Sequence, residues 1–404
     1  MNSKKILVIA GSKWQIPIVK KIKNMGHSPI VVNLYEDSPA FEYADKYGVM
    51  DILDKSACLN FAKENKIDAV LSEECDIAMP VVAYVADKIG LSALSCEMAS
   101  LYTNKFEMRE FCKINGLSYP QFRKCKNIDE AKEFLLLIGK KIIIKPLDAN
   151  SSRGVFSIDN VEDLEKYFPL AMEYSKAEQC VLAERYINGV EFTVDGIKTP
   201  EKHYTMAISQ KKHYEHNPNI ACELYFSHNS EEFNYDKLKE INDKFVNISG
   251  LEFGLTHAEY KYEDGEFYLI EIAARGGGNL ISSDIVPIMT GIDNYQYLIN
   301  CSLGDVRDDK FVVPTEYKDR CSVLHFFDAP GEGGVVQHIS GIEFLENCEN
   351  VIKWEFNFKV GDCIEKAADD SKRLGYYIAY ADNRKALNEL IEEIDKQFGI
   401  IYMN

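Results

Sequence analysis

Two glutamates stand at matching distances from the centre of a segment that predicts a β-hairpin. Residues 254–275 read GLTHAEYKYEDGEFYLIEIAAR, and Glu259 and Glu271 each lie six positions from Gly265. An odd number of loop residues would place both side chains on one face, whereas a two-residue Asp-Gly turn would place them on opposite faces. On one face the carboxylates would repel each other unless a divalent cation lay between them, and magnesium accepts such oxygen ligands. An acidic, solvated strand pair is the alternative interpretation.

The hairpin ends in a cation and a run of glycines. Arg275 follows Glu271 by four residues and precedes Gly276 to Gly278. A guanidinium at this place could stabilise phosphoryl oxygens or a developing oxyanion, and glycines allow the backbone to approach a ligand closely. A flexible surface loop would have the same composition. His257 alternates with Glu259 along the strand, so both should face the same side; it could act on an amine, hold a carboxylate or be purely structural.

Two earlier segments also combine strand ends with polar groups. Lys145 ends the apolar run IIIK, where its ammonium is costly to bury without an anion. The small polar loop NSSRGV (150–155) follows and could offer N–H groups and hydroxyls to phosphates, although it is not a Walker A loop. In AERYINGVEF, Glu184 and Glu191 lie on either side of an Asn188-Gly189 turn, where backbone groups could contact an adenine and a carboxylate a ribose. The alternatives are an ordinary hairpin loop for NSSRGV and an ordinary hairpin with exposed acids for AERYINGVEF.

The predicted secondary structure that must position these residues changes from alternating strands and helices to hairpins along the chain. Apolar strands at 5–11, 28–34 and 68–72 alternate with helices at 16–25, 59–65 and 78–89, which predicts a parallel, doubly wound sheet. Gly11 follows the first strand but lacks the GxGxxG spacing, so the domain is Rossmann-like and an NAD-dependent oxidoreductase is disfavoured.

Hairpins dominate after residue 100, and a final helix is predicted over 384–397. The segment SQKKHYEHNPN (209–219) is interpreted as a polar loop on the substrate side, with Lys211, His213 and His216 as weak candidates for substrate contacts. No low-complexity linker separates these regions, so we expect the domains to pack closely.

Composition excludes several classes of protein. A net charge of −18 without a basic patch argues against nucleic-acid binding. No apolar run approaches the ~20 residues that span a bilayer, and the apolar stretch from Ile6 to Ala10 is shorter than a signal-peptide core of roughly 7–15 residues. Eleven cysteines without a CxxC pair indicate reduced thiols. We therefore expect a cytoplasmic protein that binds neither nucleic acid nor membrane.

In this order and spacing, the segments resemble the ATP-grasp superfamily of carboxylate–amine and carboxylate–thiol ligases. The resemblance covers nearly the whole chain and implies a multi-domain α/β (α+β) fold. It would comprise a Rossmann-like domain over 1–100, an ATP-grasp core of two α+β subdomains over 101–310 with a mobile lid at about 115–185, and a small C-terminal α/β domain over 311–404.

The resemblance also implies roles for particular residues. The residues expected to contact ATP are Lys105 of TNKFEMR, Lys145, the flap residues Ser151, Ser152, Gly154 and Val155, the hinge residues Glu184, Arg185 and Ile187, and the ribose-binding Glu191. Glu259 and Glu271 would bind magnesium, and Arg275 would act with Lys145 as a catalytic residue by steadying the acyl-phosphate and tetrahedral states. His257, Gly277 and Gly278 would contact substrate.

One position departs from the usual Glu-x-Asn-x-Arg pattern of the superfamily. Ala273 stands where an asparagine normally binds metal, so either water takes that site or Asn279 reaches in. Dipeptide-forming L-amino-acid ligases often carry such a variant, and FFDAPGEGGVVQHISGIEF resembles their C-terminal domain.

The resemblance therefore implies an ADP-forming enzyme that makes an amide or peptide bond through an acyl phosphate. Its cofactors would be ATP and two magnesium ions, with manganese as a substitute, its partners small-molecule carboxylates and amines, and its assembly a homodimer. The alternatives are a purine-pathway or carboxylase-type enzyme that activates formate or bicarbonate, and a non-catalytic nucleotide sensor.

Overall fold

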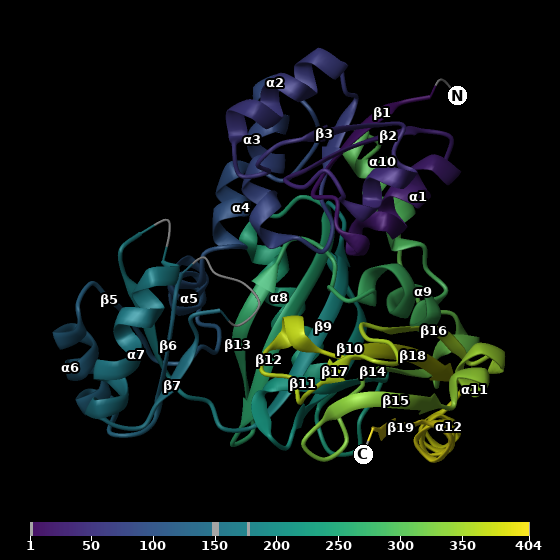
Figure 1. Ribbon diagram of the computed structural model, residues 1–404. Helices are drawn as coiled ribbons and strands as arrows, with labels where there is room; N and C mark the ends of the chain where they lie inside the picture. The colour runs from purple at the N-terminus through teal and green to yellow at the C-terminus, as the bar shows by residue number, and fades with distance from the viewer. Residues whose placement is uncertain (1–2, 148–152, 176–177, 404) are drawn as a thin grey trace.

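The computed structural model describes residues 3–147, 153–175 and 178–403 (Figure 1). The N-terminal region forms a parallel sheet in the order β3-β2-β1-β4. Its strands are β1 (Lys5–Ile9), β2 (Ser28–Asn33), β3 (Lys46–Val49) and β4 (Ala69–Leu71), flanked by helices α1 (Ile16–Asn24), α2 (Lys55–Asn65) and α3 (Met79–Ile89). This confirms the predicted doubly wound fold. Strand β3 was not predicted, because its residues are largely exposed and show no apolar run.

A second, antiparallel sheet, the small sheet, forms a separate lobe, on the left of Figure 1. Its order is β5-β8-β6-β7, with β5 (Phe122–Cys125), β6 (Ile142–Lys145), β7 (Phe156–Ile158) and β8 (Val181–Arg185). Helices α6 (Ile128–Ile138) and α7 (Val161–Tyr174) pack their apolar faces on this sheet. Helices α4 (Cys96–Leu101) and α5 (Lys105–Ile114) connect the lobe to the N-terminal region.

The third and largest sheet has eight strands in the order β13-β12-β9-β10-β11-β14-β18-β16. They are β9 (Val190–Lys198), β10 (His203–Tyr214), β11 (Asn217–Phe226), β12 (Gly254–Glu263), β13 (Glu266–Ala273), β14 (Cys321–Phe326), β16 (Val351–Phe356) and β18 (Gly375–Ala381). Because β11 pairs with β14, strands on both sides of residue 310 share one continuous sheet.

Two sequence interpretations are wrong. Strands β8 and β9 belong to different sheets, so the Asn188-Gly189 segment joins two sheets and does not close a hairpin. Residues 209–219 are not a loop, because they form most of the β10–β11 hairpin. Polar side chains of this segment pair with side chains on the neighbouring strand; Lys212, for example, contacts Glu223. The polar composition was therefore not evidence of a loop.

The β12–β13 hairpin contains an irregularity that decides where its glutamates point. Glu263 pairs with Glu266, so Asp264-Gly265 is a two-residue turn, the case expected to separate the glutamates onto opposite faces. A β-bulge between Glu259 and Tyr260 leaves Ile270 as an extra residue in β13, and Glu259 therefore pairs directly with Glu271. The bulge restores the one-face arrangement that the turn alone would have lost.

The remaining elements complete the core. They are α8 (Tyr235–Ser249), α9 (Val286–Thr290), α10 (Asn294–Ser302), α11 (Ile342–Asn347), the predicted final helix α12 (Arg384–Gln397), and a three-stranded sheet of β17 (Cys363–Ile364), β15 (Gly334–Ser340) and β19 (Gly399–Tyr402). Buried side chains from distant parts of the chain, such as Ile18, Ile285 and Leu324, pack in one cluster. Among the described residues, no helix is long and apolar enough to cross a bilayer.

We predict that Leu324→Ala destabilises the whole molecule and not only its C-terminal strands. Leu324 is fully buried between Leu224 and Ile378 in the large sheet, so the substitution should cost about 2–5 kcal/mol. Urea denaturation followed by circular dichroism should show one transition at a lower midpoint. Leu136→Ala is the control, because that side chain is 74% exposed. Two separate transitions, with only one shifted, would show that the C-terminal strands fold independently.

Candidate active site

A buried group of three charges lies where the small sheet meets helix α5. The Glu184 carboxylate accepts a hydrogen bond from Arg109 Nε at 2.6 Å and contacts Lys145 Nζ at 2.6 Å. Burial acts to raise the pKa of Glu184, but the charges of Arg109 and Lys145 hold it below its ordinary value. Burial also lowers the pKa of Lys145 to about 8, although Glu184 opposes that shift. The sequence predicted Glu184 and Lys145 but missed Arg109.

Arg109 also reaches the large sheet. Its Nη2 donates to the carbonyl of Ile270, the extra residue of the bulge, at 2.6 Å. Lys105 lies one helical turn earlier on α5 and contacts Glu271 at 2.8 Å. The four-residue spacing of Lys105 and Arg109 in the run KFEMR is the sequence signal for this arrangement, because it places both side chains on one face of a helix. Helix α5 therefore ties the two sheets together through cations.

The predicted metal-binding glutamates lie directly opposite each other, and a different lysine contacts each of them: Lys211 contacts Glu259, and Lys105 contacts Glu271. Lys211 Nζ lies 2.6 Å from Glu191 and 2.7 Å from Glu259. Burial acts to raise the pKa of Glu191, but Lys211 outweighs it and lowers that pKa to about 2. The pKa of Glu259 is also lowered, because Lys211 and His257 outweigh its burial. Lys211, a weak candidate from the sequence, is thus the central cation of this face.

The donor set at this place fits magnesium bound together with phosphates. The described residues contain no group of three or more His, Cys, Asp or Glu able to hold a metal. The protein therefore offers a pair of hard carboxylates, and the other ligands would have to be phosphate oxygens and water, as is usual for magnesium at nucleotide sites. Ala273 pairs with His257 across the strands and supplies no ligand.

The N-terminal sheet contributes to the site through residues that follow β4. Asp76 accepts hydrogen bonds from Arg275 Nε at 2.8 Å and Nη2 at 2.6 Å, and Arg275 Nη1 donates to the Gly276 carbonyl at 2.7 Å. Burial acts to raise the pKa of Asp76, but Arg275 lowers it. Asp76 was missed, although it follows a strand at the carboxyl edge where doubly wound sheets usually bind ligands.

His257 faces the same side as Glu259, as the alternation predicted, with Nε2 4.0 Å from the Glu259 carboxylate. Its Nδ1 lies 2.9 Å from Asp195. Burial acts to lower the pKa of His257, but Asp195 outweighs it and raises the pKa to about 9. A Cβ at Gly277 would lie only 2.4 Å from the Asp195 carboxylate, so this glycine lets the loop pack closely. Gly278 has open space beside it.

The remaining predicted residues are spread around this group. Gly154 packs near Pro146 and Tyr174, Val155 precedes β7, and Ile187 is buried. His213 lies 3.5 Å from Glu191. Ser151 and Ser152 lie outside the described residues.

Two predicted or candidate side chains point elsewhere. Arg185 contacts Glu263 at 2.5 Å, near the hairpin turn. His216 contacts the C-terminal region: its Nε2 donates to the Ala367 carbonyl at 3.1 Å, and its Nδ1 lies 3.6 Å from Asp328. Neither faces the Glu259–Glu271 pair.

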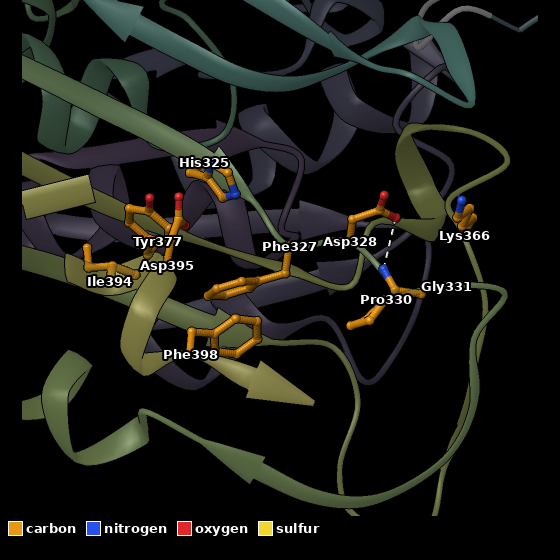
Figure 2. Close-up of a pocket in the computed structure, with 11 residues that line it drawn as sticks. His325, Phe327, Asp328, Pro330, Gly331, Lys366, Tyr377, Ile394, Asp395 and Phe398 are labelled. Carbon is orange, nitrogen blue, oxygen red and sulfur yellow. Dashed lines mark hydrogen bonds between the residues drawn. The ribbon is translucent and has the colours of Figure 1, made fainter. Parts of the chain in front are cut away.

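A separate pocket of about 410 Å³ lies in the C-terminal region (Figure 2). Phe327, Tyr377 and Phe398 give it an aromatic wall, and His325 stacks on Tyr377. Lys211 pairs with Leu224 of β11, whereas His325 pairs with the adjacent residue Glu223. Successive residues of a strand face opposite sides, so His325 and Lys211 point to opposite faces of the large sheet. The pocket contains none of the predicted site residues.

Comparison with known proteins identifies two regions. Residues 138–284 match the ATP-grasp domain family. Residues 326–402 match the L-amino acid ligase C-terminal domain 2 family.

The chain also resembles whole proteins at low identity. It is 23% identical to dapdiamide A synthase of Enterobacter agglomerans over 74% of this chain and 71% of that protein. It is 22% identical to the L-arginine-specific L-amino acid ligase of Bacillus subtilis over 87% of this chain and 85% of that protein. A formate-dependent phosphoribosylglycinamide formyltransferase of Prochlorococcus marinus is 26% identical over 63% of this chain and 64% of that protein.

Solved structures agree with these relationships. The crystal structure of an L-amino acid ligase from Bacillus licheniformis has a TM-score of 0.83 at 19% identity and covers 100% of both chains. That likeness establishes the fold, and the two matched domains agree with the predicted resemblance. The protein is an ATP-grasp ligase that carries the C-terminal domain of the L-amino acid ligases.

Proposed function

We propose that the protein uses ATP to join a carboxylate to an amine through an acyl phosphate, and that the substrates are amino acids or an amino acid and an amine. The observation that carries this proposal is the directly opposed pair Glu259 and Glu271, covered by Lys211 and Lys105. A nucleotide with its metal would replace these lysine contacts and redirect the lysines to phosphate oxygens.

The nucleotide would lie between the small and large sheets. Lys105 and Lys145 would bind phosphates, under a flap that includes Ser151, Ser152, Gly154 and Val155. Glu184 and the backbone at Ile187 would contact adenine, with Arg185 nearby. Glu191 would accept from ribose hydroxyls once Lys211 had moved off it. The pairing of Glu184 with two cations supports this reading, because it keeps the carboxylate ionised inside the protein.

Glu259 and Glu271 would hold two magnesium ions, or manganese in their place, with water or Asn279 completing the site near Ala273. Bound magnesium supplies positive charge that neutralises the transferring phosphoryl group. The protein's own part is to hold the two carboxylates at fixed positions, which the bulge at Ile270 does.

Arg275 and His257 would act in the second step of the reaction, in which the amine attacks the acyl phosphate. Asp76 fixes the guanidinium plane by two hydrogen bonds, so Arg275 is preorganised to stabilise an oxyanion. With a pKa of about 9, His257 is protonated at neutral pH. An imidazolium cannot accept the amine's proton, so we assign His257 to holding a substrate anion, with Gly277 and Gly278 forming the adjoining backbone.

A purine-pathway function is the second candidate, because formate-dependent phosphoribosylglycinamide formyltransferases match part of the chain. The match of residues 326–402 to the L-amino acid ligase C-terminal domain favours the amino-acid ligase. We further propose the domain division 1–100, 101–310 and 311–404 with a lid at about 115–185, a homodimer, and a cytoplasmic location, which the eleven free thiols support.

The deciding experiment measures magnesium-dependent release of phosphate and ADP from ATP against single amino acids and all their pairs. Release that requires a particular pair, with a dipeptide of matching mass, is expected. Release with formate or bicarbonate alone would favour the second candidate. ATP binding without release under any condition would favour a nucleotide sensor.

We predict that Arg275→Met stops ligation while sparing nucleotide binding. Removing an oxyanion donor typically lowers the rate about 10²–10³-fold, and the nucleotide contacts would remain. Ligation would be followed by product formation and ATP affinity by calorimetry. Asp76→Asn should cause a smaller loss, because the guanidinium stays but is held less firmly. Arg307→Met, at an arginine whose side chain is 68% exposed, is the control. A comparable loss of ATP affinity would contradict the assigned role.

We predict that ATP affinity falls as the pH rises through about 8. The pKa of Lys145 is lowered to about 8 in the free protein, so the neutral amine dominates above that pH and no longer attracts phosphates. Phosphates favour the charged form, and binding near pH 8 should therefore take up protons. Calorimetry in two buffers of different ionisation enthalpy measures this uptake. Lys145→Arg, which stays charged, should flatten the pH dependence; an unchanged slope in that variant would assign the titration to another group.

A further inference from the structure

One buried polar group in the C-terminal pocket has no hydrogen-bond partner. Tyr377 of β18 lines this pocket, and only 1% of its surface is exposed. Its hydroxyl is buried and forms no hydrogen bond with any described residue. Such a hydroxyl is costly, because burial removes its contacts with water and nothing in the protein replaces them. Tyr377 is therefore a place where the polar group of a ligand would be stabilised.

A carboxylate lies close to this hydroxyl. Figure 2 shows the hydroxyl end of Tyr377 beside the carboxylate of Asp395, which comes from helix α12. Burial raises the pKa of Tyr377, and the negative charges of Asp395 and Glu223 raise it further, so the hydroxyl lies within reach of both. Asp395 is exposed and forms no ion pair with any residue that the structure describes. A hydroxyl oxygen and an unpaired carboxylate thus face the same part of the pocket.

Aromatic rings form the adjoining wall. The ring centroids of Phe327 and Phe398 lie 4.5 Å apart, and those of Phe327 and Tyr377 lie 5.7 Å apart. His325 stacks on the Tyr377 ring, with 4.9 Å between the centroids and 19° between the planes. Aromatic faces attract cations and bury the apolar body of a ligand. The cavity, at about 410 Å³, falls within the range of roughly 300–1,000 Å³ that is typical of small-molecule sites.

The charges around the pocket favour a cation over an anion. Asp328 and Asp395 line it together with Lys366, which Figure 2 shows at the Asp328 end, away from Asp395. Glu223 is already balanced, because it contacts Lys212 at 2.5 Å. The carboxylate of Asp395 is thus the charge that the described lining residues leave uncompensated, and an anion beside it would be repelled.

The pocket is separate from the proposed active site. His325 and Tyr377 pair across β14 and β18, and His325 points to the face of the large sheet opposite Lys211. The next residues along these strands, Leu324 and Ile378, are buried in a cluster on the Lys211 face. A molecule in the pocket would therefore be divided from the nucleotide by the large sheet.

We propose that this pocket binds a small organic cation, an ammonium group carried on an aromatic ring, at a second site that the ligase reaction does not use. An ammonium has three N–H donors, so it can donate to the Tyr377 hydroxyl oxygen and to the Asp395 carboxylate at once. The ring of the ligand would pack against Phe327 and Phe398. This site goes beyond the proposed function and does not depend on it.

The test measures the binding of three probes of similar shape by calorimetry. They are benzylamine, which is a cation, benzyl alcohol, which is neutral, and benzoate, which is an anion. Wild-type protein should bind benzylamine with a Kd of about 1 mM or lower, as expected for a ligand of this size. Benzyl alcohol should bind about tenfold more weakly, because it loses the charged hydrogen bonds, and benzoate should not bind. Magnesium with a non-hydrolysable ATP analogue should not displace benzylamine, because the two sites are separate.

Two variants each remove one contact. Tyr377→Phe deletes only the hydroxyl, and Asp395→Asn deletes only the charge. Each should raise the Kd of benzylamine about fivefold or more, and Asp395→Asn should leave the Kd of benzyl alcohol unchanged. The unfolding midpoint of Tyr377→Phe should stay the same or rise, because a buried hydroxyl without a partner contributes no stability. Glu389→Gln is the matched control, because that carboxylate also lies on α12, is 66% exposed and does not line the pocket.

Four results would overturn the cation site. The absence of measurable benzylamine binding, or equal binding of benzyl alcohol or benzoate, would show that the pocket does not select a cation. Unchanged benzylamine affinity in both variants would place the probe elsewhere on the protein. Displacement of benzylamine by the ATP analogue would place it in the active site. A lower unfolding midpoint for Tyr377→Phe would show that the hydroxyl is satisfied within the protein or by water.

Discussion

The site depends on one constraint, namely that charges buried between two sheets must compensate each other. Arg109 sits at the centre, since it bonds Glu184 of the small sheet and the Ile270 carbonyl of the large sheet. Removing one partner of such a buried pair typically costs about 3–5 kcal/mol, because the other charge stays buried alone. These charged contacts therefore fix the position of the small sheet relative to the large sheet. A bound polyphosphate could replace the carboxylate partners of Lys105 and Lys145. The pair of Arg109 with Glu184, whose side chains are both buried, would persist.

The bulge at Ile270 is the second device that the site requires. A two-residue turn and a regular ladder would have placed Glu259 and Glu271 on opposite faces. The extra residue reverses this, and its freed carbonyl is the group that Arg109 binds. The same arginine thus stabilises the irregularity and the buried Glu184. The geometry of the carboxylate pair and the charge of the buried Glu184 are consequently linked through the Arg109 side chain.

Whether the sequence could predict a feature depended on how far apart along the chain the interacting residues lie. Periodicity predicted the N-terminal strands β1, β2 and β4 and the helix α12, because burial patterns are local, but it missed the largely exposed strand β3. It could not predict the bulge, since Ile270 is an ordinary apolar strand residue. Arg109 and Asp76 were missed because their partners lie 75 and 199 positions away. The polar run 209–219 was misread for a related reason, as Lys211 is satisfied by Glu191 on the adjacent strand β9 and by Glu259 on β12, one strand further along the sheet.

The N-terminal sheet shows how a common fold can serve a site outside itself. Its carboxyl edge, where doubly wound sheets usually bind a ligand, instead directs Glu73 and Asp76 at the backbone and guanidinium of residues 275–276. Asp76 neutralises Arg275 and fixes its plane, while Glu73 anchors the following loop through an N–H. The loop is glycine-rich and could not hold one conformation by its own side chains. Its order therefore comes from residues of the N-terminal sheet, and the position of Arg275 depends on how that sheet packs against the large sheet.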